Sequence, residues 1–136
     1  MTLSQALFTH VAGLANVVAV ASDRVYAVDA PRPSSVSAPY EDVVVISFEG
    51  AEHDSLNNEP CNRIANYVIT VVSKSHLRAV ELAESIVRSL YGYRGTMGGV
   101  GGVAVVDIEA TETPEDFDPE HSLFARNISL RITYEF

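Results

Sequence analysis

The sequence predicts an α+β fold, in which a mainly antiparallel β-sheet of four to five strands carries two α-helices packed on one face. Apolar residues recur at helical spacing in segments 3–14 and 77–90, whereas β-branched or alternating runs at 43–48, 62–73 and 127–136 are typical of strands. The order is helix, strands, helix, strands. Helices separated from hairpin-type strands favour the α+β class over a parallel sheet.

The first helix is predicted from four apolar residues on one helical face: Leu3, Leu7, Val11 and Leu14. Thr2 and Gln5 have the spacing of a capping box, which fixes the start of this helix. Gly13 and Asn16 weaken its end. The β-branched run at 17–20 therefore predicts a turn or an extended segment.

The middle of the chain alternates between short strands and polar connections. Residues 24–26 predict a short strand, and 29–35 predict a loop or arm because their two prolines cannot pair in a central strand. The β-branched run 43–48 predicts a strand. Residues 50–60 show no apolar period, so we expect an exposed loop there.

The next two elements are the clearest in the chain. Segment 62–73 predicts a long strand whose two faces are both partly apolar. A helix follows, with its predicted inner face at Leu77, Val80, Ala83, Val87 and Leu90. Ser73 or Ser75 can cap its start, and Gly92 stands where a helix-ending residue belongs.

The last third predicts a glycine-rich loop at 95–102, a strand at 103–108 and an acidic turn at 111–120. The closing strand, 127–136, alternates apolar and polar residues throughout. A slip of one residue would turn its apolar side chains to water, so its register is well specified.

Length and composition indicate a single domain that spans residues 1–136, without disulfides because Cys61 is the only cysteine. The formal net charge of −9 opposes a dedicated nucleic-acid binder, which needs clustered cations. No uninterrupted apolar run reaches the ~20 residues of a membrane span. We therefore expect a soluble protein without a membrane partner.

Motifs for catalysis or cofactor binding are weak. The glycines follow a helix and precede a strand, the reverse of the order in a phosphate-binding loop. The histidines do not have the spacing of a zinc site: His10, His53, His76 and His121. The acids between Asp107 and Glu120 could bind a hard cation, but they lack the spacing of a helix-loop-helix calcium site, and a solvated acidic turn is the ordinary explanation. We expect no enzyme, no cofactor and no metal.

Several segments, taken in order, resemble a known family. They are Arg24–Tyr26, Ala38–Tyr40 before the strand at 43–46, Leu90–Gly95 at the end of the second helix, and the closing strand 123–134. On these residues the sequence resembles the bacteriophage tail completion or tail terminator family, which also occurs in prophages and gene transfer agents. An additional Gly-Gly pair at 101 and 102 and a polar insertion at 54–59 depart from the family pattern.

The resemblance implies a virion structural protein in the neck region of a tail, assembled in the host cytoplasm. Such a subunit forms a homo-oligomeric ring, expected to be a hexamer, that caps the head-proximal end of the tail tube and ends its polymerisation. Its implied partners are the tail tube protein and a head-tail connector or stopper protein. DNA would pass through the lumen without specific binding.

Four loops are candidate contact surfaces: 29–40, 50–60, 95–102 and 111–120. The candidate contact residues on these loops or directly beside them are Arg32, Pro33, Tyr40, His53, Asn57, Arg94, Met97, Glu115, Asp116 and Asp118. Part of the acidity could line the lumen, where negative charge would keep DNA from adhering. Two other interpretations remain open: a neighbouring head-tail connector or stopper subunit, and a small-molecule-binding α+β domain.

Overall fold

The computed structural model describes residues 2–21, 25–27, 42–56, 59–113, 116–118 and 123–135. The helices are α1 (Leu3–Ala12), α2 (Ala15–Ala21) and α3 (His76–Leu90). The strands are β1 (Val25–Ala27), β2 (Val43–Leu56), β3 (Glu59–Ser73), β4 (Gly95–Met97), β5 (Val103–Glu112), β6 (Asp116–Asp118) and β7 (Leu123–Glu135).

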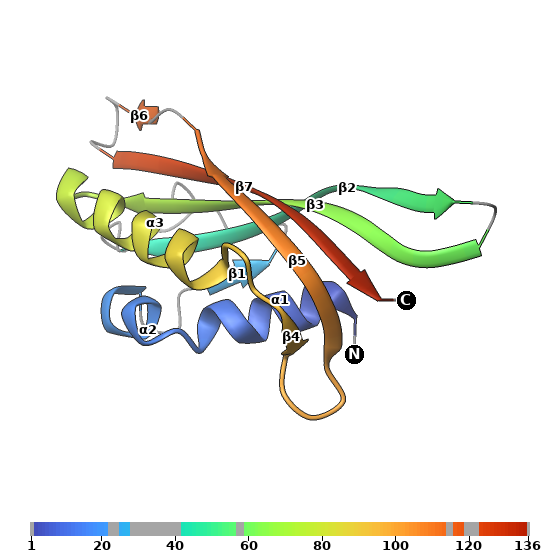
Figure 1. Ribbon diagram of the computed structural model, residues 1–136. Coiled ribbons are helices and arrows are strands. Elements are labelled where there is room, and N and C mark those ends of the chain that lie inside the picture. The colour runs from blue at the N-terminus through green and yellow to red at the C-terminus, as the bar shows by residue number, and fades with distance from the viewer. Residues whose placement is uncertain are drawn as a thin grey trace.

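The strands form one sheet in the order β1-β2-β3-β7-β5-β4, and β6 pairs with β7 beside this path. Every neighbouring pair is antiparallel except β1 and β2, which run parallel. The sheet curls into a half-barrel with the helices on its concave side (Figure 1). The α+β class is confirmed, but the predicted numbers of strands and helices were too low, and the parallel β1–β2 pair makes the mainly antiparallel sheet a mixed one.

The N-terminal segment folds into two helices rather than one. Thr2 caps α1 through the predicted capping box with Gln5, and the helix ends at Gly13. The turn or extended segment predicted at 17–20 is wrong, because these residues form α2. Val17 and Ala21 lie one turn apart on a buried face of α2, which packs against α3. Burial of that face outweighs the modest helix propensity of valine.

Among the described residues, no single helix combines the length and the apolar composition that crossing a membrane requires. Helices α1 and α2 meet that test only as a pair, and the chain bends by 72° between them. Their apolar faces contribute to the core, since Leu7 and Val17 are both fully buried.

Strands β2 and β3 form a hairpin that extends well past the predicted strand at 43–48. The loop predicted at 50–60 is largely strand, with Ala51 opposite Ala65 and Asp54 opposite Asn62. A register shift between Phe48 and Gly50 interrupts the ladder once before this extension. Backbone pairing needs no apolar alternation, so the sequence pattern could not show the extension.

Helix α3 has the predicted ends but a partly different inner face. Ser75 is its N-cap, and Gly92, with φ +72°, follows its C-cap. Leu77, predicted to be buried, is 64% exposed. The buried face consists of Ala79, Leu82, Ala83, Ile86 and Leu90. Both stripes have helical spacing, and the position of the sheet decides which one is buried.

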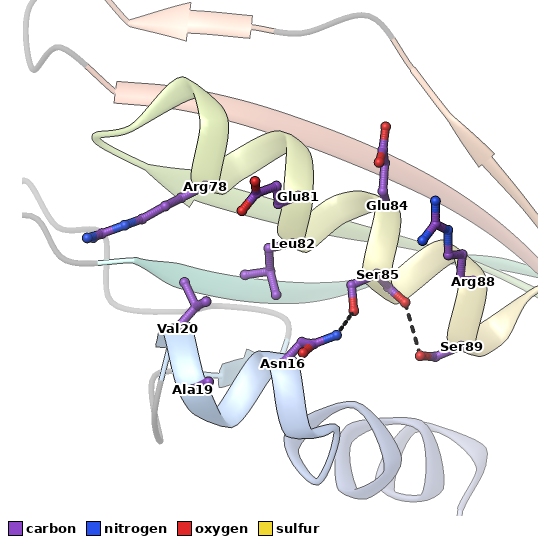
Figure 2. A pocket seen from close by; sticks show the side chains of 10 residues that line it. All are labelled: Asn16, Ala19, Val20, Arg78, Glu81, Leu82, Glu84, Ser85, Arg88 and Ser89. Carbon is purple, nitrogen blue, oxygen red and sulfur yellow. Dashed lines mark hydrogen bonds between the residues drawn. The ribbon is translucent and has the colours of Figure 1, made fainter.

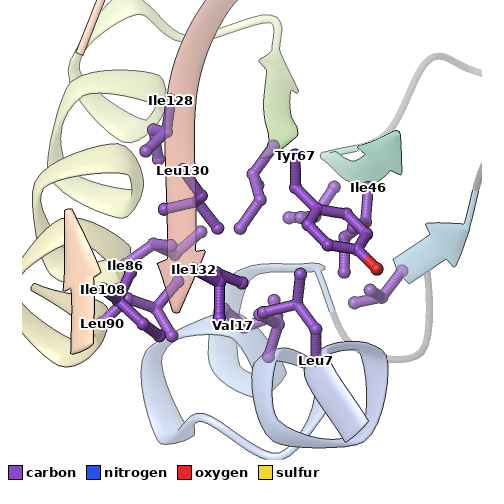
Figure 3. Close-up of a cluster of buried hydrophobic side chains, with 14 of the residues drawn as sticks. Leu7, Val17, Ile46, Tyr67, Ile86, Leu90, Ile108, Ile128, Leu130 and Ile132 are labelled. Carbon is purple, nitrogen blue, oxygen red and sulfur yellow. The ribbon is translucent and has the colours of Figure 1, made fainter. Parts of the chain in front are cut away.

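The core lies between the concave face of the sheet and the three helices (Figure 3). Strand β7 supplies Ile128, Leu130 and Ile132, all of which are buried, so the predicted alternation of this strand is confirmed. Side chains from α1, α2 and α3 meet them from the other side. Because β7 lies between β3 and β5, its apolar residues occupy the centre of the core.

Candidate functional site

The structure describes the predicted contact residues unevenly. Five fall outside the described residues: Arg32, Pro33, Tyr40, Asn57 and Glu115. His53 lies in β2, and Asp116 and Asp118 lie at the two ends of β6. Arg94 is exposed before β4, whereas Met97 is fully buried and belongs to the subunit's own core.

The turn between β4 and β5 carries the most exposed large apolar side chain of the described chain, Val100. Gly98, Gly99 and Gly101 adopt φ values of +90°, +81° and +76°, which residues with a Cβ rarely tolerate. A Cβ on Gly102 would lie only 2.0 Å from the carbonyl oxygen of Met97. Glycines are therefore required in this turn, which projects from the body of the molecule (Figure 1).

Contacts with α1 and β5 fix the base of this turn. The hydroxyl of Tyr93 donates a hydrogen bond of 2.9 Å to the carbonyl oxygen of Thr96. The rings of His10 and Tyr93 meet edge to face at 4.9 Å. Burial lowers the pKa of the His10 imidazole below its ordinary value of 6.5. The neutral histidine therefore serves as a packing group between α1 and the start of β4.

A neutral groove of about 490 Å³ runs between α1 and β1. It is lined by Ser4, Gln5, Phe8, Thr9, Val25 and Tyr26. Phe8 packs against the core from one side and forms part of the groove on the other. None of the lining side chains is an acid or a base, so the groove suits an apolar occupant.

A second cavity of about 490 Å³ lies between α2 and α3 (Figure 2). Charged side chains of both signs surround it: Arg78, Glu81, Glu84 and Arg88. The amide of Asn16 donates a hydrogen bond of 2.5 Å to the hydroxyl of Ser85 and joins the two helices. The lining contains no thiol or imidazole that could act as a nucleophile or a general base.

The convex face of the sheet contains a shallow groove of about 440 Å³ across β2, β3, β7 and β5. The strand register places Glu109 opposite Arg131, and Thr111 opposite Ser129. Glu49 and Asn66 line the same groove from β2 and β3. This mixture of charges resembles an ordinary solvated sheet surface rather than a reaction site.

A polar network anchors the start of α3. Asp42 is 8% exposed and accepts a hydrogen bond of 2.5 Å from the hydroxyl of Ser73. The backbone nitrogen of Ser75 donates to the Ser73 hydroxyl in turn, and an Arg78 guanidinium nitrogen lies 3.4 Å from Asp42. This network joins β2, β3 and α3, so its role is structural. Across the described ranges, no three His, Cys, Asp or Glu side chains gather closely enough to hold a metal ion.

Comparison with known proteins finds a similar fold but no similar sequence. No family model and no curated protein matches the chain. A chain in the virion of a native gene transfer agent particle superposes with a TM-score of 0.69, over 98% of this chain and 95% of that chain. The two chains share one fold. At 14% identity the likeness concerns the fold alone.

Sequence reasoning missed two features of the surface. It selected the glycine loop at 95–102 but not Val100, although its position between two glycine pairs was a visible signal. No local pattern in the sequence indicates the groove between α1 and β1. Its residues come from two segments that only the tertiary fold brings together.

Proposed function

We propose that this chain is a structural subunit of a phage-type particle that forms a ring on the head-proximal end of the tail tube. The ring would end polymerisation of the tube and join the tail to the head connector. The observation that carries the proposal is the shared fold with a chain of a gene transfer agent virion, which extends over nearly the full length of both chains. The resemblance of the sequence to tail terminators supports the finer assignment.

The arrangement of the described surfaces agrees with an assembly role. The β2–β3 hairpin extends beyond the helices, and the β4–β5 turn projects separately (Figure 1). A curled sheet with helices on one side holds both protrusions in place, as expected of contact loops on a rigid scaffold. A hexameric ring would let the protrusions of each subunit reach its neighbours and the tube.

The proposal includes no chemical step. The linings of the described cavities contain no thiol and no imidazole, and each lining is neutral or carries both charges. The net charge of −9 suits a ring whose lumen passes DNA without retaining it. In the proposed ring, part of this acidity lines the lumen and keeps passing DNA from adhering.

The decisive experiment incubates the purified protein with tail tube subunits and measures tube lengths by electron microscopy. A terminator shortens the tubes as its concentration rises and is seen as extra density at one end only. A connector or stopper subunit leaves the length distribution unchanged and binds only to tubes that are already capped. If the protein neither binds tube ends nor changes their length, the proposed function is wrong.

A further inference from the structure

Val100 is placed for contact with another molecule. Single exposed apolar residues are common on protein surfaces. Val100, however, sits at the end of a projecting turn that a hydrogen bond of 3.0 Å from the backbone nitrogen of Gly102 to the carbonyl oxygen of Gly99 closes, with Gly99 and Gly101 at positive φ. The flanking glycines have no side chains, so a partner can approach the backbone on both sides of the valine. A pre-shaped apolar protrusion loses little conformational entropy when it is buried.

The groove between α1 and β1 has the complementary properties. Its volume of about 490 Å³ accommodates a valine side chain together with the backbone of the neighbouring glycines. Phe8 and Val25 offer apolar surface, and Ser4, Gln5 and Thr9 are uncharged. Because Val100 is fully exposed in its own subunit, it does not fill the groove of the same chain.

The two features lie beside the two edge strands of the curled sheet, and α1 contacts both of these strands. Strand β1, which lines the groove, is one end of the strand order, and β4, which leads into the turn, is the other. A ring with head-to-tail contacts needs two different patches on each subunit, so that each copy uses one patch toward each neighbour. The protrusion and the groove meet this requirement.

Charge favours the same pair of surfaces. Copies of a chain with a net charge of −9 repel one another, and contact is easiest where both surfaces lack charge. The turn segment 98–102 contains only glycines and Val100. The side chains that line the groove are also neutral.

We infer that the Val100 turn of one copy inserts into the groove between α1 and β1 of the next copy. This contact is the head-to-tail interface between subunits, so the inference rests on the proposed ring and names the surfaces that form it. Val100 is the apolar anchor, and the groove around Phe8 receives it. Repetition of the contact around the ring would occupy every groove.

Cysteine cross-linking tests the contact directly. In a Cys61→Ser background, Thr9→Cys on the groove is combined with Val100→Cys on the turn, and the full chain is oxidised at high concentration. Only the pair can link each copy to two neighbours, so we expect a ladder of trimers and larger species on a denaturing gel without reductant. Each single variant gives dimers at most. Absence of species above the dimer overturns the inference.

A matched control places the second cysteine on another exposed valine. Val106 is 37% exposed on β5, and Thr9→Cys with Val106→Cys has the same number of thiols as the test pair. We expect no ladder from this control. A ladder of equal strength would show that random collisions, rather than the proposed interface, form the cross-links and would overturn the inference.

A charge exchange gives an independent measurement. Val100→Lys should weaken self-association roughly tenfold or more, as loss of a buried anchor does. Thr9→Glu in the same chain should restore part of the affinity, because the new carboxylate would face the new ammonium group across the interface. Sedimentation measures the affinity, and unchanged thermal unfolding confirms that Val100→Lys folds. No rescue by Thr9→Glu counts against the inference.

Failure of this inference can be separated from failure of the proposed function. If tube lengths fall but the Thr9 and Val100 pair gives no ladder, the ring uses other surfaces and only the inference is wrong. If the ladder forms but the protein has no effect on tube growth, the self-contact is correct and the proposed function is wrong.

Discussion

The hydroxyl oxygens of Ser4 and Tyr67 lie 2.7 Å apart and connect the first turn of α1 to β3. Tyr67 is buried, and its ring meets Phe48 edge to face at 5.3 Å. The contact therefore lies near the register shift at which the β2–β3 hairpin begins its extension. It holds the base of the hairpin against the helical layer.

Tyr67→Phe should lower the free energy of unfolding by about 0.5–1.5 kcal/mol, because it removes this hydrogen bond and keeps the ring. Chemical denaturation measures the loss. Tyr91→Phe is the control, since Tyr91 is 66% exposed and its substitution should leave stability unchanged. Equal effects of the two substitutions would contradict the prediction.

The same tyrosine predicts a dependence on alkaline pH. Burial raises the pKa of Tyr67 above its ordinary value of 10.0, against a smaller opposing effect of the Ser4 hydrogen bond. Its contribution to stability is complete below pH 10 and is lost as the pH rises through the folded pKa, because the unfolded tyrosine ionises first. Tyr67→Phe should reduce the fall in unfolding free energy measured between pH 9 and pH 11.

His10 predicts the opposite dependence in mild acid. Its pKa is lowered by burial, so the unfolded histidine binds a proton first and stability falls as the pH drops below 6.5. Unfolding free energies at pH 7.5 and pH 5.5 measure this fall. His10→Gln should make the difference between the two pH values smaller. A difference equal to that of the unsubstituted protein would show that His10 is not responsible.

The β4–β5 turn allows a comparison of two glycines that are needed for different reasons. Gly102→Ala should lower stability by roughly 2–3 kcal/mol, because the added methyl group would clash with the Met97 carbonyl oxygen. Gly101→Ala meets no such atom and only strains a positive φ, at a cost of roughly 1 kcal/mol. Thermal unfolding measures both variants. A smaller loss for Gly102→Ala would contradict the close approach.

Asp42 should matter far more than the arginine beside it. Asp42→Ala removes the acceptor of the buried Ser73 hydroxyl and should cost roughly 2–3 kcal/mol. The Arg78 side chain is 66% exposed, so Arg78→Ala should cost less than about 1 kcal/mol. Urea unfolding of both variants tests the order. A larger loss for Arg78→Ala would show that the ion pair, not the hydrogen bond, stabilises this corner.

The acidic turn tests the proposed passage of DNA. Glu115→Gln, Asp116→Asn and Asp118→Asn are introduced together, and DNA delivery is measured in particles that assemble from the variant. We expect rings of normal size but slower delivery, because a less negative lumen retains DNA longer. Unchanged delivery would show that these acids do not face the lumen.

The sequence was sufficient to predict an element of the fold where a single local pattern determines the structure. Alternation in β7 identified both the strand and its buried side chains, Ile128, Leu130 and Ile132. Thr2 and Gln5 identified the start of α1, because a capping box is complete within four residues.

Other elements depended on partners that are distant in the sequence. Val17 is helical because α2 packs against α3, and Leu77 is exposed because the sheet lies under an adjacent, overlapping stripe of α3. The hairpin beyond Gly50 exists through backbone pairing with β3. The candidate contact between Val100 and the groove had the weakest local signal, since glycines indicate a turn but not what it meets.

The position of β7 has a consequence for synthesis on the ribosome. β7 is the last described strand in chain order, yet it pairs with β3 from Asn62 opposite Glu135 to Ser73 opposite Phe124. Until β7 emerges, β3 presents one unpaired edge, which can pair with a similar edge of another nascent chain. Cellular yield should therefore depend on chaperones that bind nascent chains, most strongly when many ribosomes translate one message.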